Sequence, residues 1–266
     1  MRQDDEDGRN TRYHRYRVPQ PEGKTVLVSG GGAGIGSSIV AHYCAQKAKV
    51  AFVDINAEAS EALVDSISTL GHPAPRFFQC DLRDIEKYQG IIKTVAEEMG
   101  SISVLINNAA HDERHDMPDV TPEYWDDRVA VNMKHVFFAI QAVAPMMVEA
   151  GAGSIINFGS ISWMNGQADL PVYASSKASI HGLTRGTANY YGKHGVRCNT
   201  IVPGWIFTER QKDLWYDEAG EAALQANQFL RGHIDPWEVA RMALFLGSDD
   251  SKMCTAQNFV VDGGWT

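Results

Sequence analysis

Residues 24–36 of the chain read KTVLVSGGGAGIG, and this stretch determines the fold that we predict. Residues 24–29 form a short apolar run typical of a buried strand, and the run leads directly into a glycine turn at 30–36. Apolar residues then recur at helical spacing over 37–47. Glycines let backbone N–H groups and a helix N-terminus approach a pyrophosphate closely. The order of strand, glycine turn and helix therefore predicts a dinucleotide site.

The next apolar run, at 49–53, ends in Asp54, eighteen residues beyond Gly36. A carboxylate at this place accepts hydrogen bonds from the ribose hydroxyls of the adenosine and repels a 2′-phosphate. No lysine or arginine lies between Ser29 and Gly36. The sequence therefore predicts NAD as the cofactor rather than NADP.

Strand and helix signals alternate along the rest of the chain, which predicts an α/β fold: one doubly wound (Rossmann) parallel sheet of about seven strands with helices on both faces. The predicted strands are 24–29, 49–54, 76–80, 103–106, 154–159, 196–202 and 257–261. The predicted helices after the first are 57–70, 84–99, 121–149, 173–193 and 235–246. We expect one Rossmann-type domain at 24–266 and a polar N-terminal extension at 1–23, where a solvated or subunit-contacting role is favoured over an RNA-binding or membrane-contacting arm.

Composition narrows the class of protein. The formal charge of −9 and pI of about 5.4 give no reason to expect binding to nucleic acid or to an anionic membrane. The four cysteines are scattered through apolar segments, as in a cytoplasmic protein with reduced thiols. We find no apolar run of about twenty residues. The run HDERH at 111–115 lacks the spacing of a closed zinc site, so we interpret it as a polar substrate loop and expect no metal.

Tyr173 and Lys177 are four residues apart in the segment YASSK, and Ser160 lies thirteen residues upstream. On a helix this spacing places the tyrosine and the lysine on one face, where the ammonium favours the ionised phenol. Such a tyrosine can act as a general base. The same spacing also occurs in surface residues of ordinary amphipathic helices. The catalytic interpretation of the pair therefore depends on the motifs around it.

Five motifs together resemble the short-chain dehydrogenase/reductase family: SGGGAGIG at 29–36, NNAA at 107–110, Ser160, the Tyr173–Lys177 pair, and Pro203-Gly204. The resemblance implies hydride transfer with Ser160, Tyr173, Lys177 and Asn132 as catalytic residues, Asn132 supporting a water-linked proton path from the lysine. It also implies that Lys177 binds the nicotinamide ribose and lowers the pKa of Tyr173. The cofactor-binding residues implied by position are Gly30, Gly34, Ile35, Gly36, Asp54, Asp81, Leu82, Asn108, Ala109, Tyr173, Lys177, Pro203, Ile206 and Thr208. Ser29 and Ala110 depart from the family's usual threonine and glycine.

Three segments, at 111–115, 156–163 and 253–256, are similar to those of bacterial aldose 1-dehydrogenases within the family, which oxidise the anomeric hydroxyl of a cyclic sugar to a lactone. Charged and amide groups beside indole rings suit a pyranose. The predicted substrate residues are Ser160, Ser162, Trp163, Asn165, Tyr173, Trp205, Arg210 and His111. A ketone, 3-oxoacyl or other alcohol substrate, or a dinucleotide-binding protein without turnover, are the alternatives. Members of the family are commonly homotetramers, and we expect the same here.

Overall fold

The computed structural model describes residues 21–266, so most of the predicted N-terminal extension lies outside the described residues. Seven parallel strands form one sheet in the order β3-β2-β1-β4-β5-β6-β7. The strands are β1 (Thr25–Ser29), β2 (Lys49–Asp54), β3 (Arg76–Gln79), β4 (Ile102–Asn107), β5 (Gly153–Phe158), β6 (Val196–Pro203) and β7 (Asn258–Val261). All seven predicted strands are confirmed, with ends that differ by one residue at most.

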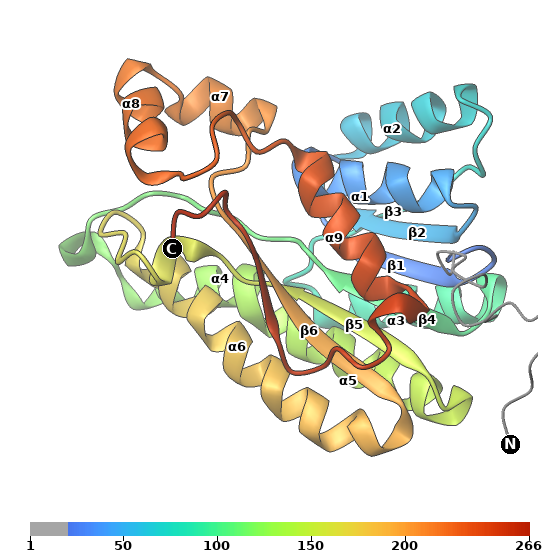
Figure 1. Ribbon diagram of the computed structural model, residues 1–266. Coiled ribbons are helices and arrows are strands. Elements are labelled where there is room, and N and C mark those ends of the chain that lie inside the picture. The colour runs from blue at the N-terminus through green and yellow to red at the C-terminus, as the bar shows by residue number, and fades with distance from the viewer. Residues whose placement is uncertain (1–20) are drawn as a thin grey trace, which may run out of the picture.

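Helices cover both faces of the sheet (Figure 1). The elements packed against one face are α1 (Gly34–Ala45), α2 (Ala57–Thr69) and α9 (Pro236–Gly247), and those against the other are α3 (Ile85–Met99), α5 (His135–Ala150) and α6 (Pro171–Tyr191). Alternate strand residues supply the two cores: Val26 and Val28 of β1 face one, and Leu27 faces the other. The doubly wound fold is therefore confirmed.

The chain reverses its direction of winding between β1 and β4, which are adjacent in the sheet. The carboxyl ends of these strands are level, since Ser29 pairs with Asn107 and Asn107 pairs with Asn157 of β5. Ligands of doubly wound sheets bind in the crevice at such a switch point. The predicted dinucleotide site lies here.

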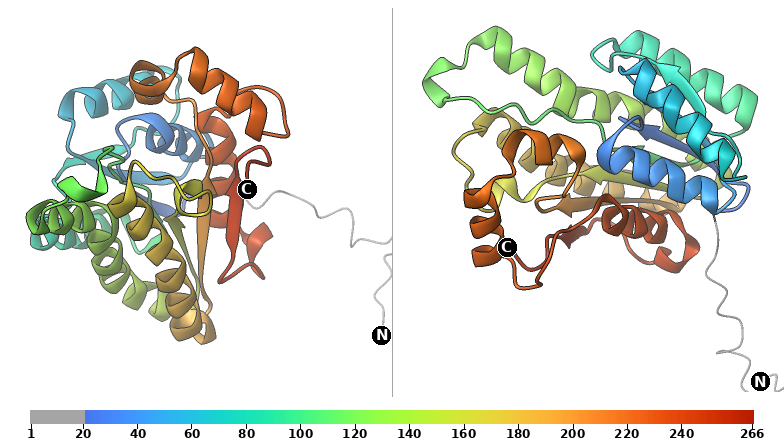
Figure 2. Two further views of the ribbon diagram at one scale, coloured as in Figure 1. Left: turned by 90° about the vertical axis from the view of Figure 1, so that its left-hand side faces the viewer. Right: turned by 90° about the horizontal axis from the view of Figure 1, so that it is seen from above.

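Two helices were missing from the sequence-based prediction, α7 (Glu209–Trp215) and α8 (Glu218–Asn227). They stand apart from the two helical layers, at one end of the sheet (Figures 1 and 2). Both are short and polar, and Leu224 is their one buried residue, so their apolar periodicity is weak. Their N-caps, Thr208 and Asp217, do accept hydrogen bonds from the backbone and are the signal that could have revealed them. We refer to residues 209–227 as the α7–α8 unit.

Helix α5 is the last part of one continuous helical stretch. The stretch begins with α4 (Pro122–Val129), passes through a π-helical turn η2 (Ala130–Lys134) and ends with α5. At Pro122–Ala150 it is long and apolar enough to cross a membrane by length and composition, so the expectation that no segment approaches this composition was wrong. The apolar side chains of α5 pack in the core against β4, β5 and α3. Burial within the fold accounts for this composition.

The remaining short turns are the 3₁₀ helices η1 (Met117–Asp119), η3 (Ile161–Trp163), η4 (Gly192–His194) and η5 (Asp249–Ser251). Helix α9 begins with proline in its first turn, and the Asp235 side chain makes no cap hydrogen bond. Three cysteines are buried free thiols, and Cys254 is half-buried.

Candidate active site

The glycine turn after β1 is packed as closely as glycine allows. Gly30 has a φ of +67°, and a Cβ placed there would lie 2.8 Å from the Cα of Ala109. A Cβ on Gly36 would lie 1.8 Å from the carbonyl oxygen of Gly30. Helix α1 begins inside the turn, at Gly34, and the first N–H groups of a helix have no partner within it. The turn therefore offers the backbone donors and the helix end that a pyrophosphate needs.

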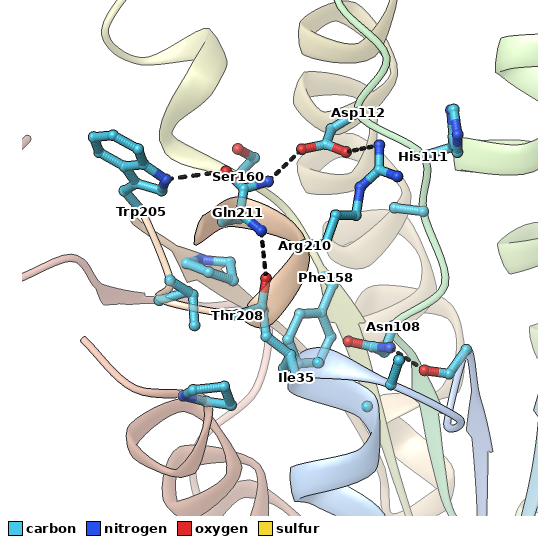
Figure 3. Close-up of a pocket in the computed structure, with 18 of the residues that line it drawn as sticks. Ile35, Asn108, His111, Asp112, Phe158, Ser160, Trp205, Thr208, Arg210 and Gln211 are labelled. Carbon is cyan, nitrogen blue, oxygen red and sulfur yellow. Dashed lines mark hydrogen bonds and ion pairs between the residues drawn. The ribbon is translucent and has the colours of Figure 1, made fainter. Parts of the chain in front are cut away.

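Ser29 stands where the family usually has a threonine, and its hydroxyl accepts hydrogen bonds from the residues that follow β4. Its Oγ accepts hydrogen bonds from the amides of Asn108 at 3.1 Å and Ala109 at 3.2 Å. The Asn108 side chain donates in turn to the carbonyl oxygens of Ser29 at 3.1 Å and Gly30 at 2.9 Å (Figure 3). These bonds join the glycine turn to the end of β4.

Asp54 ends β2 beside the glycine turn. Its Oδ2 accepts a hydrogen bond from the amide of Gly32 at 2.8 Å, and its Oδ1 accepts one from the amide of Asn56 at 2.9 Å. Each carboxylate oxygen has two lone pairs, so acceptor capacity remains for a ribose. The carboxylate both supports the turn and faces the cleft.

The Tyr173–Lys177 pair lies on α6, one helical turn apart. The lysine is 2 % exposed, and its Nζ donates to the carbonyl oxygen of Phe158 at 2.9 Å. Its Nζ is 5.6 Å from the centroid of the Tyr173 ring. Ser160 follows β5, and its Oγ accepts a hydrogen bond from the amide of Ser162 at 3.1 Å. The chain thus brings all three residues to one cleft from β5 and α6.

The pKa values of this pair differ from the sequence-based expectation. Burial raises the pKa of Tyr173 above its usual value, the Asp112 carboxylate raises it further, and Ser160 lowers it. Burial lowers the pKa of Lys177 to about 8, and Asp112 opposes this change. The expectation that Lys177 lowers the pKa of Tyr173 is therefore not met among the protein's own groups. The lysine is directed to a backbone carbonyl, and desolvation dominates both side chains.

Asn132 lies in η2 and is fully buried. Its Oδ1 accepts from the amide of His111 at 2.8 Å, and its Nδ2 donates to the carbonyl oxygen of His111 at 3.2 Å. The carboxamide therefore fixes the backbone at the start of the predicted substrate loop.

The α7–α8 unit closes the other side of the cleft (Figure 3). Asp112 accepts hydrogen bonds from Arg210 Nη2 at 3.2 Å and from Gln211 Nε2 at 2.7 Å. The Oε1 of Gln211 accepts from Trp205 Nε1 at 3.0 Å. The side chains of Asp112 and Gln211 were not among the predicted site residues. Asp112 lies inside a segment that the sequence singled out, whereas Gln211 lies on a helix that was not predicted.

All fourteen predicted cofactor-binding residues line the same cleft, and so do seven of the eight predicted substrate residues. Trp163 is the predicted substrate residue that does not line the cleft. Its Nε1 donates to His181 Nε2 at 3.0 Å and its ring packs edge-on against that imidazole, so its assignment to the substrate pocket is corrected. Asn132 lies behind the cleft wall, in contact with His111.

The cleft has a volume of about 1990 Å³. Single small-molecule sites usually occupy about 300–1,000 Å³, so this cleft is larger than one small ligand requires. The glycine turn, the end of α1 and Asp54 provide donors and an acceptor suited to a dinucleotide at one side. Asp112, Arg210 and Gln211 lie at the other side, next to Tyr173.

Comparison with known proteins agrees with this geometry. A family model described as Enoyl-(Acyl carrier protein) reductase matches residues 30–266. The chain is 45 % identical over 248 residues to the D-xylose 1-dehydrogenase of Caulobacter vibrioides, covering 93 % of this chain and 97 % of that protein. The chain belongs to the short-chain dehydrogenase/reductase family. It is thus an oxidoreductase of a family that uses NAD(P).

Other members of the family are also similar. The "Probable galactose dehydrogenase GalD" of Rhizobium meliloti is 43 % identical over 93 % of this chain and 97 % of its own length. A solved structure of a short-chain type dehydrogenase/reductase from Mycobacterium ulcerans superposes with a TM-score of 0.87 and 26 % identity, covering 92 % of this chain and 90 % of that one. The similarity extends over nearly all of the described fold.

Proposed function

We propose that the protein oxidises a cyclic aldose at its anomeric hydroxyl, transferring hydride to NAD and releasing an aldonolactone. The observation that carries the proposal is the pairing of two groups in one cleft. Tyr173, Lys177 and Ser160 form a proton-transfer set, and Asp112, Arg210 and Gln211 provide both acceptors and donors for several hydroxyls. Relatives named for xylose and galactose support the same class of substrate.

NAD, when bound, accepts the hydride from the anomeric carbon. Tyr173, in its ionised form, takes the proton of the anomeric hydroxyl as the carbonyl of the lactone forms. Ser160 orients the reacting oxygen by a hydrogen bond. Lys177 would hold the nicotinamide ribose of a bound cofactor, and Asn132 holds the backbone of the loop that borders the site. The chain thus supplies orientation and proton transfer.

NAD is proposed over NADP on the basis of Asp54. Its carboxylate ends β2 beside the glycine turn and lines the cleft, and a carboxylate at this position would accept hydrogen bonds from ribose hydroxyls and repel a 2′-phosphate. The other proposed cofactor contacts are the remaining thirteen of the fourteen cleft residues given above, with Asp81 and Leu82 beside the adenine. On the substrate side, Ser160, Ser162, Asn165, Tyr173, Trp205, Arg210 and His111 are the proposed contacts.

A ketone or 3-oxoacyl substrate is the alternative, and the matched family model carries an enoyl reductase description. Long acyl chains call for a largely apolar pocket. The carboxylate and guanidinium of Asp112 and Arg210 would be costly to leave beside an acyl chain. The polar lining therefore favours the sugar.

The experiment that tests the proposal is a panel of xylose, arabinose, fucose, galactose, glucose and rhamnose with NAD or NADP, following reduced nicotinamide at mildly alkaline pH. Turnover of an aldose with NAD, and appearance of its lactone, is the expected result. If the protein binds NADH yet oxidises none of these sugars, the aldose proposal is rejected, and ketone and acyl substrates are tested next.

We also propose that the protein works in the cytoplasm as a homotetramer, with residues 1–23 as a polar extension of the domain at 24–266. Family resemblance supports the tetramer, and free thiols support a reducing compartment. Light scattering coupled to size exclusion would test the oligomeric state.

A further inference from the structure

The side chains of residues 111–115 alternate between two sides of the chain, with the odd-numbered ones at α4 and the even-numbered ones at the α7–α8 unit. Two of them have a further partner: Arg114 Nη1 donates to Asp169 Oδ2 at 2.6 Å, and His115 Nε2 accepts from the amide of Val172 at 3.4 Å. The side chains of His111 and Glu113 both bind Arg128 of α4, with Glu113 Oε2 at 2.9 Å from Arg128 Nη1. His115 also contacts α4, since its Nδ1 lies 2.9 Å from Tyr124 Oη. The segment therefore presents its odd-numbered side chains to α4.

The even-numbered side chains contact the α7–α8 unit. Asp112 accepts from Arg210 and Gln211, as described above. The guanidinium of Arg114 lies 3.8 Å from the centre of the Trp215 ring. Figure 3 shows His111 and Asp112 directed to different sides of the chain. Because neighbouring side chains of an extended segment point in opposite directions, holding 111 and 113 on one side directs 112 to the other.

The Arg128 side chain is largely buried and is held by its own neighbours on α4. It is 14 % exposed, its Nε donates to Asp127 Oδ2 at 3.0 Å, and its guanidinium lies 5.4 Å from the Tyr124 ring. The backbone of His111 is held independently by Asn132. Backbone and side chain of the segment are thus fixed from the same helix, two residues on either side of its π-helical start.

We propose that Arg128 is a positioning residue for the reaction: by binding the side chains of His111 and Glu113, it holds the carboxylate of Asp112 toward the substrate side of the cleft and the α7–α8 unit. Arg128 itself acts through Asp112. The predicted effect on KM rests on the proposed aldose oxidation. The predicted effect on the position of Asp112 and of the α7–α8 unit rests on the contacts alone.

The test compares Arg128→Met with Arg76→Met, in the full chain. Arg76 is a matched control because it also pairs with a carboxylate, Glu98, and lies over an aromatic ring, Phe78, at 5.2 Å, on β3. We expect Arg128→Met to raise the KM for the aldose about tenfold while the Kd for NADH stays within about twofold. Arg76→Met should change neither quantity.

A double-mutant cycle separates positioning from general structural damage. In the Asp112→Asn background, Arg128→Met should raise KM by less than about twofold, since the group that it positions is already altered. An equal effect in both backgrounds, or no effect in the wild-type background, would overturn the proposal. Glu113→Gln removes the negative charge that pairs with Arg128 at an exposed side chain, and this variant takes the place of Arg128→Met in the cycle if Arg128→Met fails to fold.

Hydrogen–deuterium exchange gives a readout that does not require turnover. We expect Arg128→Met to speed amide exchange in both 111–116 and 209–215, the second through the lost orientation of Asp112. Unchanged exchange in 209–215 would refute the positioning role. If the wild-type protein oxidises no aldose, the proposed function is rejected. Hydrogen–deuterium exchange then still tests whether Arg128 positions Asp112.

Discussion

Asp54→Ala is expected to shift the cofactor preference from NAD toward NADP, and the size of this shift can be worked out from the contacts of the carboxylate. Each oxygen already accepts one backbone amide, at 2.8 and 2.9 Å, and retains a lone pair for a ribose hydroxyl. A hydrogen bond to a charged group contributes about 1.5–3 kcal/mol, so losing one weakens NAD binding roughly 10- to 150-fold. Removing a like charge near the 2′-phosphate improves NADP binding by about 1 kcal/mol or more, which is about fivefold. The ratio of the two affinities should therefore change by about 50-fold or more.

The assay is fluorescence titration with NADH and NADPH, together with kcat/KM for both oxidised cofactors. Asp54→Asn separates charge from structure, because its amide oxygen can still accept from Gly32 while the negative charge is gone. Asp112→Asn serves as the control, a carboxylate of the same cleft on the substrate side, and should leave the ratio unchanged. A ratio in Asp54→Ala within twofold of the wild-type value would refute the reasoning.

Three further outcomes are expected. Tyr173→Phe should lower kcat by about 10²–10⁴-fold while NADH binding is retained, and retained turnover would contradict the proton-transfer role. Aldose oxidation needs the ionised form of Tyr173, whose pKa is raised, so the rate should increase with pH on the alkaline side. Asp112→Asn should move this increase to lower pH because it removes a charge that raises the pKa of Tyr173. A pH–rate profile checks both, and a profile that stays in place or moves to higher pH in Asp112→Asn would contradict the assignment of Tyr173 as the base. Tyr43→Phe removes a buried 2.7 Å hydrogen bond to the carbonyl oxygen of Ala243 and should cost about 1–3 kcal/mol in the free energy of unfolding. Calorimetry should then show a melting temperature lower by roughly 2–10 °C, with the exposed Tyr190→Phe as control.

Local patterns predicted most of the fold because the physics behind them is local. Apolar runs of four to eight residues form buried strands, and apolar residues at helical spacing form the helices that cover them. The glycine turn needs its glycines because Gly30 and Gly36 approach other backbone atoms too closely for any side chain. The cleft residues predicted from motif positions therefore assemble at the switch point where those strands end.

The substrate side could not be read from local patterns in the same way. Helices α7 and α8 bury almost no apolar surface of their own, and Gln211 reaches Asp112 across 99 residues of sequence. Trp163 belongs to the predicted segment, but its indole binds His181 and does not line the cleft. The direction of the Tyr173 and Lys177 pKa changes likewise depends on burial and on Asp112, which packing alone establishes. Residue types and their spacing along the chain carry the fold and the chemistry of this protein, whereas side-chain direction, desolvation and contacts between distant segments arise only when the chain is packed.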